Sequence, residues 1–297
     1  MEYKIHQYRF DNFTKHEEII RQAFNELGHT EVDNPIHGLV EWNVYNHCHV
    51  NEVYTANNII FKPTAPTSRH FALDTIGYAN SSSLAFIKPL QVEMRNWPET
   101  DHNVINALIE TKSNKWDDSI LLKWRKPKIK IPNDHVLIIG QQPHDETVNG
   151  FGFGDHWKKI CQIVNAIPKD NIVIKLHPAM KGKKEQIAKW RKEGITVIDG
   201  FISIHDVLPR TRVAIIDNST AGIECLMHQV PIISYGWPEY HWATKKLQTL
   251  TELPDLVKHL DWHDAEYANN FILWYIHEYL CYDVESTKTR INGIINS

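Results

Sequence analysis

Apolar and polar positions in the second half of the chain follow two alternating periods. Five short runs rich in Val, Ile and Leu have the length of buried strands: 136–140, 171–176, 195–199, 212–217 and 231–236. Segments with helical spacing lie between most of them: 156–167, 183–194, 203–210 and 220–229. Strands that alternate with helices over short connections are typical of an open parallel sheet covered by helices on both faces.

The first half has a less regular pattern. Segments 17–28, 104–112 and 119–125 are expected to be helical, and 57–63 and 70–74 to be strands. Charged residues and prolines gather at 123–134, which is typical of a linker. The aromatic-rich segment 264–282 predicts one long helix that could return to the first half of the chain.

These patterns predict an α/β protein with two Rossmann-like domains that face a cleft, and with a C-terminal helix that crosses back to the first domain. The expected boundaries are 1–126 for the first domain, 127–134 for the linker, 135–262 for the second domain and 263–297 for the returning helix.

Composition limits the function. With 297 residues, 34.6 kDa, 42% hydrophobic and 23% charged residues, the chain has the composition of a soluble globular protein. A formal net charge of −4 argues against a nucleic-acid partner. The four cysteines lie far apart, without the spacing of metal or redox motifs. No signal peptide and no membrane-spanning run of about 18 apolar residues are recognisable, so we expect a cytoplasmic protein without an integral membrane segment.

Polar and aromatic side chains follow four of the five predicted strands. Because the carboxyl ends of parallel strands meet at one edge of a sheet, these side chains are expected to lie together and to bind a ligand. They are Gln141, Gln142, His144 and Asp145 after the first strand, His177 after the second, Asn218, Ser219 and Thr220 after the fourth, and Tyr235, Trp237 and Tyr240 around the end of the fifth.

The predicted helix after the fourth strand begins with small residues, namely Ser219, Thr220, Ala221 and Gly222. Small side chains would let a phosphate group approach the free N–H groups of the helix N-terminus, although Ser219 or Thr220 could simply cap the helix. Glu224 could accept hydrogen bonds from both hydroxyls of a ribose, or could merely favour the helix dipole. His177 could donate a hydrogen bond to a phosphate oxygen.

In the first half, Asp74 ends a predicted strand and precedes Thr75, Ile76, Gly77 and Tyr78. A carboxylate at a strand end that faces a cleft is suited to be a catalytic base, but an aspartate is equally common as a turn residue. Asp145 is the second candidate. Thr75 and Tyr78, with Trp237 and Tyr240, are the candidate contacts for an acceptor or a sugar.

Several familiar chemistries lack their motifs. The glycines at 150, 152 and 154 do not have the dinucleotide spacing, and neither a P-loop nor a Gly-x-Ser-x-Gly sequence occurs. His47 and His49 could form part of a metal site, but no third ligand is evident nearby. The sequence Asp-x-Asp, common in metal-dependent sugar transferases, is also absent, so we expect no metal and no cofactor.

Three motifs together resemble the bacterial capsule-type Kdo transferases. They are GQQPHDETV at 140–148, KLHP at 175–178 and NSTAGIECLMHQVPIISYGWPEYHW at 218–242. The resemblance implies the GT-B architecture, with the nucleotide sugar bound by the second domain and the acceptor on the side of the first. It implies donor-binding roles for Gln141, His177, Ser219, Thr220 and Glu224, and it matches Asp74 only loosely.

The size of the chain also resembles compact relatives from large algal DNA viruses that add neutral sugars such as xylose. On this basis we expect a metal-independent glycosyltransferase that moves a neutral sugar from a UDP-sugar onto a glycan hydroxyl. Asp74 would act as general base in an inverting reaction, or as nucleophile in a retaining one. The alternatives are a CMP-Kdo-type retaining transferase, a nucleotide-sugar epimerase and a non-catalytic glycan-binding module.

Overall fold

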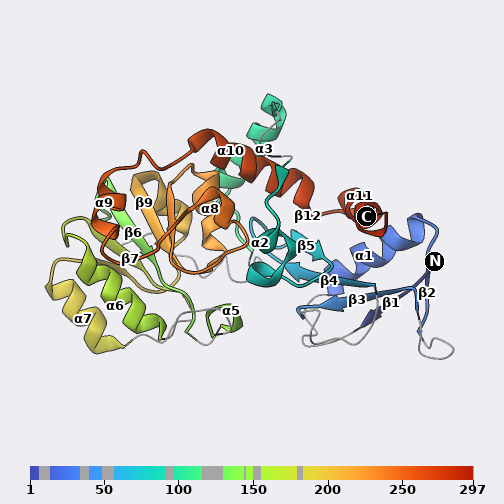
Figure 1. Ribbon diagram of the computed structural model, residues 1–297, viewed down its shortest axis with the longest axis horizontal. Helices are drawn as coiled ribbons and strands as arrows, with labels where there is room; N and C mark the ends of the chain where they lie inside the picture. The colour runs from blue at the N-terminus through green and yellow to red at the C-terminus, as the bar shows by residue number, and fades with distance from the viewer. Residues whose placement is uncertain are drawn as a thin grey trace.

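A computed structural model describes most of the chain. The described residues are 1–6, 14–33, 40–48, 57–90, 92, 96–115, 130–143, 145–149, 155–178 and 183–296. The expected helix at 119–125, the first residues of the expected linker, and His49 therefore lie outside the described residues. Within these ranges the chain forms two six-stranded sheets, which lie in separate lobes of the molecule (Figure 1).

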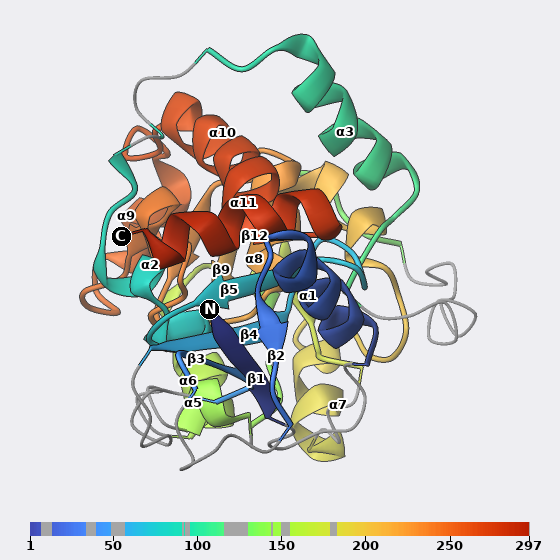
Figure 2. The same cartoon turned by 90° about the vertical axis from the view of Figure 1, so that its right-hand side faces the viewer.

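The first sheet has the strand order β12-β5-β4-β3-β1-β2. Its strands are β1 (Glu2–His6), β2 (Thr30–Glu31), β3 (Trp42–Asn46), β4 (Asn58–Pro63), β5 (Phe71–Asp74) and β12 (Leu280–Cys281). The four strands β1 to β4 run parallel, whereas β5 is antiparallel to β4 and β12 is antiparallel to β5. Helices α1 (Thr14–Glu26) and α11 (Val284–Ile295) cover one face, where Phe24, Phe61 and Ile291 share an apolar core (Figure 2).

The second sheet is parallel and has the strand order β11-β10-β9-β6-β7-β8. Its strands are β6 (His135–Ile139), β7 (Ile172–Lys175), β8 (Thr196–Ile198), β9 (Thr211–Ile216), β10 (Ile232–Ser234) and β11 (Lys245–Lys246). This arrangement confirms the predicted open parallel sheet, and β11 adds a short edge strand that the pattern did not indicate. The expected helix at 203–210 is instead a pair of 3₁₀ turns, Ile204–Asp206 and Leu208–Arg210.

Helices cover both faces of the second sheet because successive strand residues point to opposite sides. Ile138 and Ile174 belong to the core with α6 (His156–Ala166), α7 (Lys184–Lys192) and α9 (Leu253–Lys258). Their strand neighbours Leu137 and Val173 belong to the core with α8 (Ala221–Met227) and α10 (Ala265–Trp274). Three further helices, α2 (Ser83–Phe86), α3 (Glu99–Glu110) and α5 (Glu146–Asn149), lie in the connections.

The C-terminal segment crosses from the second domain to the first, as predicted, but it is not one long helix. Helix α10 ends at Trp274, a π-helical turn spans Tyr275–Tyr279, and Leu280–Cys281 then form β12 beside β5. The sequence stays apolar where the helix gives way to the strand, because Leu280 and Cys281 are buried in the sheet just as the preceding apolar residues are buried on a helix face. Asp283 then caps α11 through a capping box with Ser286, a signal that the sequence carried and our prediction missed.

Candidate functional site

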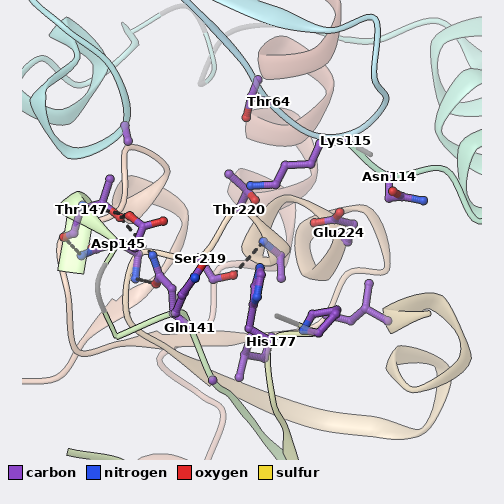
Figure 3. A pocket seen from close by; sticks show the side chains of 18 of the residues that line it. Thr64, Asn114, Lys115, Gln141, Asp145, Thr147, His177, Ser219, Thr220 and Glu224 are labelled. Carbon is purple, nitrogen blue, oxygen red and sulfur yellow. Dashed lines mark hydrogen bonds between the residues drawn. The ribbon is translucent and has the colours of Figure 1, made fainter. Parts of the chain in front are cut away.

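A cavity lies between the two sheets, at the carboxyl ends of strands β6, β7 and β9 (Figure 3). The first domain contributes Lys62, Thr64 and Tyr78, and the segment after α3 contributes Asn114 and Lys115. Nine of the site residues predicted in the second domain line it: Gln141, Gln142, Asp145, His177, Asn218, Ser219, Thr220, Ala221 and Glu224. Their placement is consistent with the prediction that the residues after the strand ends form one ligand-binding site. His144 lies outside the described residues.

Lysine side chains bring positive charge to this cavity. Lys175 is the last residue of β7 and is only 6% exposed, and Lys115, from the segment after α3, also lines the cavity (Figure 3). Burial lowers the pKa of Lys175 to about 8, while the charge of Glu224 opposes this shift. Because this value is above 7, Lys175 is still mainly protonated at neutral pH. Neither lysine was predicted as a site residue, although Lys175 stands in the KLHP motif, two residues before His177.

Glu224 is a buried carboxyl group at the same site. It is 6% exposed, and within the described part of the chain its Oε2 atom has no hydrogen-bond partner. Burial raises its pKa to about 7, although the charges of Lys115 and Lys175 oppose that shift. An unpaired buried oxygen is costly, so Glu224 is suited to accept a hydrogen bond from a ligand hydroxyl.

His177 follows Lys175 at the same strand end. Burial, together with the charges of Lys115 and Lys175, lowers the pKa of His177 to about 4. The imidazole is therefore neutral at physiological pH and can donate one N–H group, but it brings no positive charge. The lysines, not His177, supply the positive charge in this cavity.

Asp145 is another carboxyl group of the second domain that lines the cavity (Figure 3). Its Oδ1 atom accepts hydrogen bonds from the backbone N of Thr147 at 2.9 Å and from its hydroxyl at 2.5 Å. Within the described residues, Oδ2 accepts no hydrogen bond. Burial would raise the pKa of Asp145, but the Thr147 hydrogen bonds and the charges of Lys62 and Lys115 outweigh it and hold the pKa below its usual range.

Gln141 is held by internal hydrogen bonds on several sides. Its side-chain Nε2 donates to the Thr147 hydroxyl at 3.0 Å, and its Oε1 accepts from the backbone N of Asn218 at 3.2 Å. Its backbone N donates to Nε2 of His156 at 2.8 Å. Gln141 therefore connects the ends of β6 and β9 and supports Thr147, and this uses one N–H group and one lone pair of its side-chain amide.

Asp74 does not face the cleft, and this part of the prediction is wrong. It is 1% exposed and does not belong to the described residues that line the cavity. Oδ1 accepts from the backbone N atoms of Ile76 and Gly77, and Oδ2 accepts from the backbone N and hydroxyl of Ser83. The carboxylate organises the loop after β5, which is the turn-forming role left open in the sequence analysis. Thr75 is exposed and likewise does not line the cavity.

Tyr240 and Gly222 form a packing unit behind the site instead of lining it. Tyr240 is 2% exposed, and its hydroxyl donates a hydrogen bond to the carbonyl O of Ser219. A Cβ atom on Gly222 would come within 2.2 Å of the Tyr240 ring, so glycine is required there for close approach. Helix α8 itself begins at Ala221 and has only 7 residues, which makes its N-terminus a weaker anion site than predicted.

Trp237 contacts the first domain instead of the cavity. Its indole N–H donates to the carbonyl O of Ala85 at 3.2 Å, and His241 makes a 3.0 Å hydrogen bond to the same oxygen. Trp242 donates to the carbonyl O of Leu84 at 2.7 Å. These side chains satisfy the carbonyls of the four-residue helix α2 and join the domains. Tyr235 is buried within the second domain and does not line the cavity either.

Glu239 joins the second domain to the first domain and to the C-terminal segment. Glu239 lines the cavity. Its carboxyl group accepts a 2.5 Å hydrogen bond from the hydroxyl of Tyr275 and a 3.4 Å hydrogen bond from the hydroxyl of Ser82. Burial raises the pKa of Glu239, and the Tyr275 hydrogen bond opposes this. Glu239 stands in the polar segment that follows the fifth predicted strand, as a rim residue would, but its hydrogen-bond partners come from segments far away in the chain.

Comparisons with known proteins agree with this architecture. A family model described as capsule polysaccharide biosynthesis protein matches residues 92–250. The KpsC β-Kdo 2,4 transferase of Thermosulfurimonas dismutans is similar in structure, with a TM-score of 0.57, 15% identity, and coverage of 99% of this chain and 98% of that chain. The KpsC β-Kdo 2,7 transferase of the same organism has a TM-score of 0.58 at 13% identity, with 99% of each chain covered. At such identities the similarity shows a shared fold. Comparison with curated protein sequences gave no match.

Proposed function

This chain belongs to the capsule polysaccharide biosynthesis protein family, and we propose that it is a glycosyltransferase that moves a sugar from a nucleotide donor onto a glycan hydroxyl. The observation that carries the proposal is the cavity between the two sheets, where Lys115 and Lys175 lie near the carboxyl groups of Asp145 and Glu224. Such a site offers charge for phosphate, an acceptor for hydroxyl groups, and a carboxylate for proton transfer.

The donor would bind with its phosphate groups near Lys115 and Lys175. Two lysine ammonium groups can offset the negative charge that develops on a leaving phosphate. A neutral His177 can add one hydrogen bond, and Ser219 and Thr220 are placed to contribute hydroxyl groups. This arrangement supports metal-independent transfer as part of the proposal, because protein cations take the place that a metal ion fills in other transferases.

Glu224 would accept hydrogen bonds from the ribose hydroxyls of the donor. Its unpaired, buried Oε2 atom supports this assignment, because a ligand hydroxyl would remove the cost of the unpaired oxygen. Binding of the donor phosphate would favour the protonated form of Lys175, whereas hydrogen bonds from the ribose hydroxyls would favour the ionised form of Glu224. A rise in pH would therefore weaken the contact with Lys175 and strengthen the contact with Glu224.

Asp145 replaces Asp74 as the proposed catalytic carboxylate. Its pKa is held below the usual range, so it is ionised at neutral pH, and its Oδ2 atom is available on the cavity side. In an inverting reaction Asp145 would accept the proton of the acceptor hydroxyl, whose oxygen attacks the anomeric carbon while the nucleotide leaves. In a retaining reaction the same carboxylate would attack the anomeric carbon first, with release of the nucleotide, and the acceptor oxygen would then displace the carboxylate from the glycosyl-enzyme.

We propose a UDP-linked neutral sugar such as UDP-xylose as the first donor to test, and CMP-Kdo as the alternative. The lysines support either choice, since they can balance the diphosphate of the first or the phosphate and sugar carboxylate of the second. The glycan-binding alternative has lost its support, because Trp237 and Trp242 bond to α2 and Tyr240 is buried. The sugar and the nucleotide of the donor are both part of this proposal.

The deciding experiment is transfer from a panel of nucleotide sugars, with glycan acceptors present and absent, in buffer with and without EDTA. Acceptor-dependent release of nucleotide, with a mass increase of one sugar on the acceptor, is the expected result. Release of nucleotide without acceptor would instead indicate an epimerase or a hydrolase. Activity that EDTA abolishes and a divalent cation restores would overturn the metal-independent part of the proposal.

A further inference from the structure

Asp145 owes its orientation to a residue that lies on the next turn of the chain. Thr147 belongs to α5, a helix of 4 residues, and directs both its backbone N and its hydroxyl to Oδ1 of Asp145. The same hydroxyl accepts a hydrogen bond from Gln141. The Thr147 hydroxyl therefore has its proton committed to Asp145 and its lone pair to Gln141, which leaves the carboxylate one favoured orientation.

The carbonyl group of Thr147 is held by two asparagine side chains, one from each domain. Asn218, at the end of β9, donates from Nδ2 to Thr147 O at 2.9 Å. Asn80, in the first domain, donates from Nδ2 to the same oxygen at 3.3 Å. A single helical turn is not stable by itself, so these two amides help to hold α5 in place, together with the hydrogen bonds of Thr147 to Asp145 and Gln141.

The segment that carries Asn80 is attached to the second domain at several points. Asn80 lies in the 3₁₀ turn Ala79–Ser81, directly before α2, whose carbonyls accept hydrogen bonds from Trp237 and Trp242. Ser82 also donates to Glu239. Asn80 is 1% exposed and is not among the described residues that line the cavity, so it does not touch a bound substrate itself.

From this geometry we propose that Asn80 is a positioning residue that couples the arrangement of the two domains to the orientation of the Asp145 carboxylate, through Thr147. The inference rests on the proposed glycosyltransferase function and goes beyond it. When the domains are held together, the amide of Asn80 reaches Thr147 and α5 keeps Asp145 in its reactive orientation. When the domains separate, that hydrogen bond is lost and the carboxylate gains freedom. The domain contact thereby contributes to catalysis and not only to stability.

The test compares Asn80→Ala and Asn80→Ser with the parent protein. We expect kcat to fall by about tenfold to a hundredfold, because a small misplacement of a reacting group has effects of this size. The Kd for free nucleotide, measured by titration calorimetry, should change by less than threefold. Asn171→Asp is the matched control: it removes another asparagine amide that donates to a backbone carbonyl, at 3.0 Å from Asn133 O, and should leave kcat at the parental value.

A double-mutant cycle with Thr147→Val distinguishes positioning from a general structural role. If Asn80 acts through Thr147, the double variant will be about as slow as the slower single variant. Thr147→Val removes a hydrogen bond to the ionised carboxylate of Asp145 and should therefore raise the pKa of Asp145. In a plot of kcat against pH, the acidic limb should then move to higher pH. Asn80→Ala should move it in the same direction. Thr147→Ser should restore the parental limb.

Two results would overturn the inference while leaving the proposed function intact. One is a parental kcat in Asn80→Ala, provided that the parent itself transfers sugar. The other is a double variant whose loss equals the product of the two single losses, together with an unshifted acidic limb. If Asn80→Ala does not fold, the Asn80→Ser and Thr147→Ser measurements decide the question. Failure of the parent to transfer sugar from any donor would instead count against the proposed function.

Discussion

Ser83 donates two hydrogen bonds to one oxygen of Asp74, from its backbone N at 2.9 Å and from its hydroxyl at 2.5 Å. The hydroxyl of Tyr279 lies 3.5 Å from the same oxygen. Asp74 thus joins the loop after β5 to the start of α2 and to the C-terminal crossing segment. A carboxylate surrounded by donors in this way stabilises the fold around the cleft, and it has no free lone pair directed at a substrate.

The first prediction concerns this carboxylate. Asp74→Asn would place an NH₂ group against N–H and O–H donors, so we expect the free energy of unfolding to fall by about 2–4 kcal/mol, the range typical of a disrupted buried network. Urea unfolding followed by circular dichroism measures it. Asp134→Asn, at a residue in the turn before β6, is the control. A variant as stable as the parent but without transfer activity would return Asp74 to the catalytic role.

A second prediction concerns pH and Lys175. Its pKa in the free protein is about 8, since burial lowers it, and a bound phosphate should raise that pKa again. Protonated lysine binds the anion better, so nucleotide affinity should be highest below pH 8 and should fall as pH rises above it. Titration calorimetry between pH 6.5 and pH 9.5, about one unit and a half on either side of this pKa, measures the trend.

Lys175→Met tests the same assignment. The variant keeps the length of the side chain without its charge, so we expect nucleotide affinity to fall about tenfold to a hundredfold and its decline above pH 8 to disappear. Lys184→Met, on the exposed first turn of α7, provides a matched control. An unchanged pH dependence in Lys175→Met would show that another group is responsible.

A third prediction concerns Glu224. Glu224→Gln should weaken binding of a ribonucleotide by about 1–3 kcal/mol, because one of the two acceptor oxygens for the ribose hydroxyls is replaced by an NH₂ donor. Binding of the corresponding 2′-deoxyribonucleotide should be affected less. Both affinities can be measured by competition against a fluorescent nucleotide. Equal losses for the two ligands would contradict the ribose assignment.

The same substitution should not destabilise the free protein at pH 8. The pKa of Glu224 is raised to about 7 in the folded state, above its value of about 4.5 in an unfolded chain. The folded state therefore holds the extra proton between these values, and its stability decreases as pH rises through this range. A neutral amide removes that decrease. Thermal melts at pH 5 and pH 8 should show a smaller difference for Glu224→Gln than for the parent.

A fourth prediction concerns the close packing of Tyr240 on Gly222. A Cβ atom at position 222 would come within 2.2 Å of the Tyr240 ring, which cannot move easily because it is buried. Gly222→Ala should lower the free energy of unfolding by about 1–3 kcal/mol through overpacking and should displace Ser219, whose carbonyl accepts the Tyr240 hydroxyl. Combining it with Tyr240→Leu should recover part of the stability. No gain in the double variant would mean that the clash lies elsewhere.

The strand and helix pattern of the second domain could be predicted because each element there is specified by its own residues. The strand ends at Ile139, Lys175 and Ile216 bring their following residues to one cavity, which is a property of parallel sheets in general. Residues whose position depends on distant segments could not be found in this way. Lys115 reaches the cavity from the segment after α3, and Asp74 accepts a hydrogen bond from Tyr279, which lies 205 residues away.

The misassigned aromatic residues have a similar explanation. Trp237, Tyr240 and Trp242 stand near a strand end, as ligand-binding aromatics often do, but their polar atoms bond to backbone carbonyls. From sequence, an indole N–H that caps a helix and one that faces a glycan look alike. Only the position of α2, which comes from the first domain, separates the two possibilities.

The pairing of Leu280–Cys281 with β5, and of α11 with α1, has a consequence for synthesis on the ribosome. The second sheet is built from one continuous stretch of chain, from His135 to Lys246, so all its strands are available before the C-terminal segment has emerged. The first sheet lacks an edge strand and the packing of α11 until residues 280–295 have emerged. The half of the protein that is made first is thus completed last, against the usual order in which domains fold as they are synthesised.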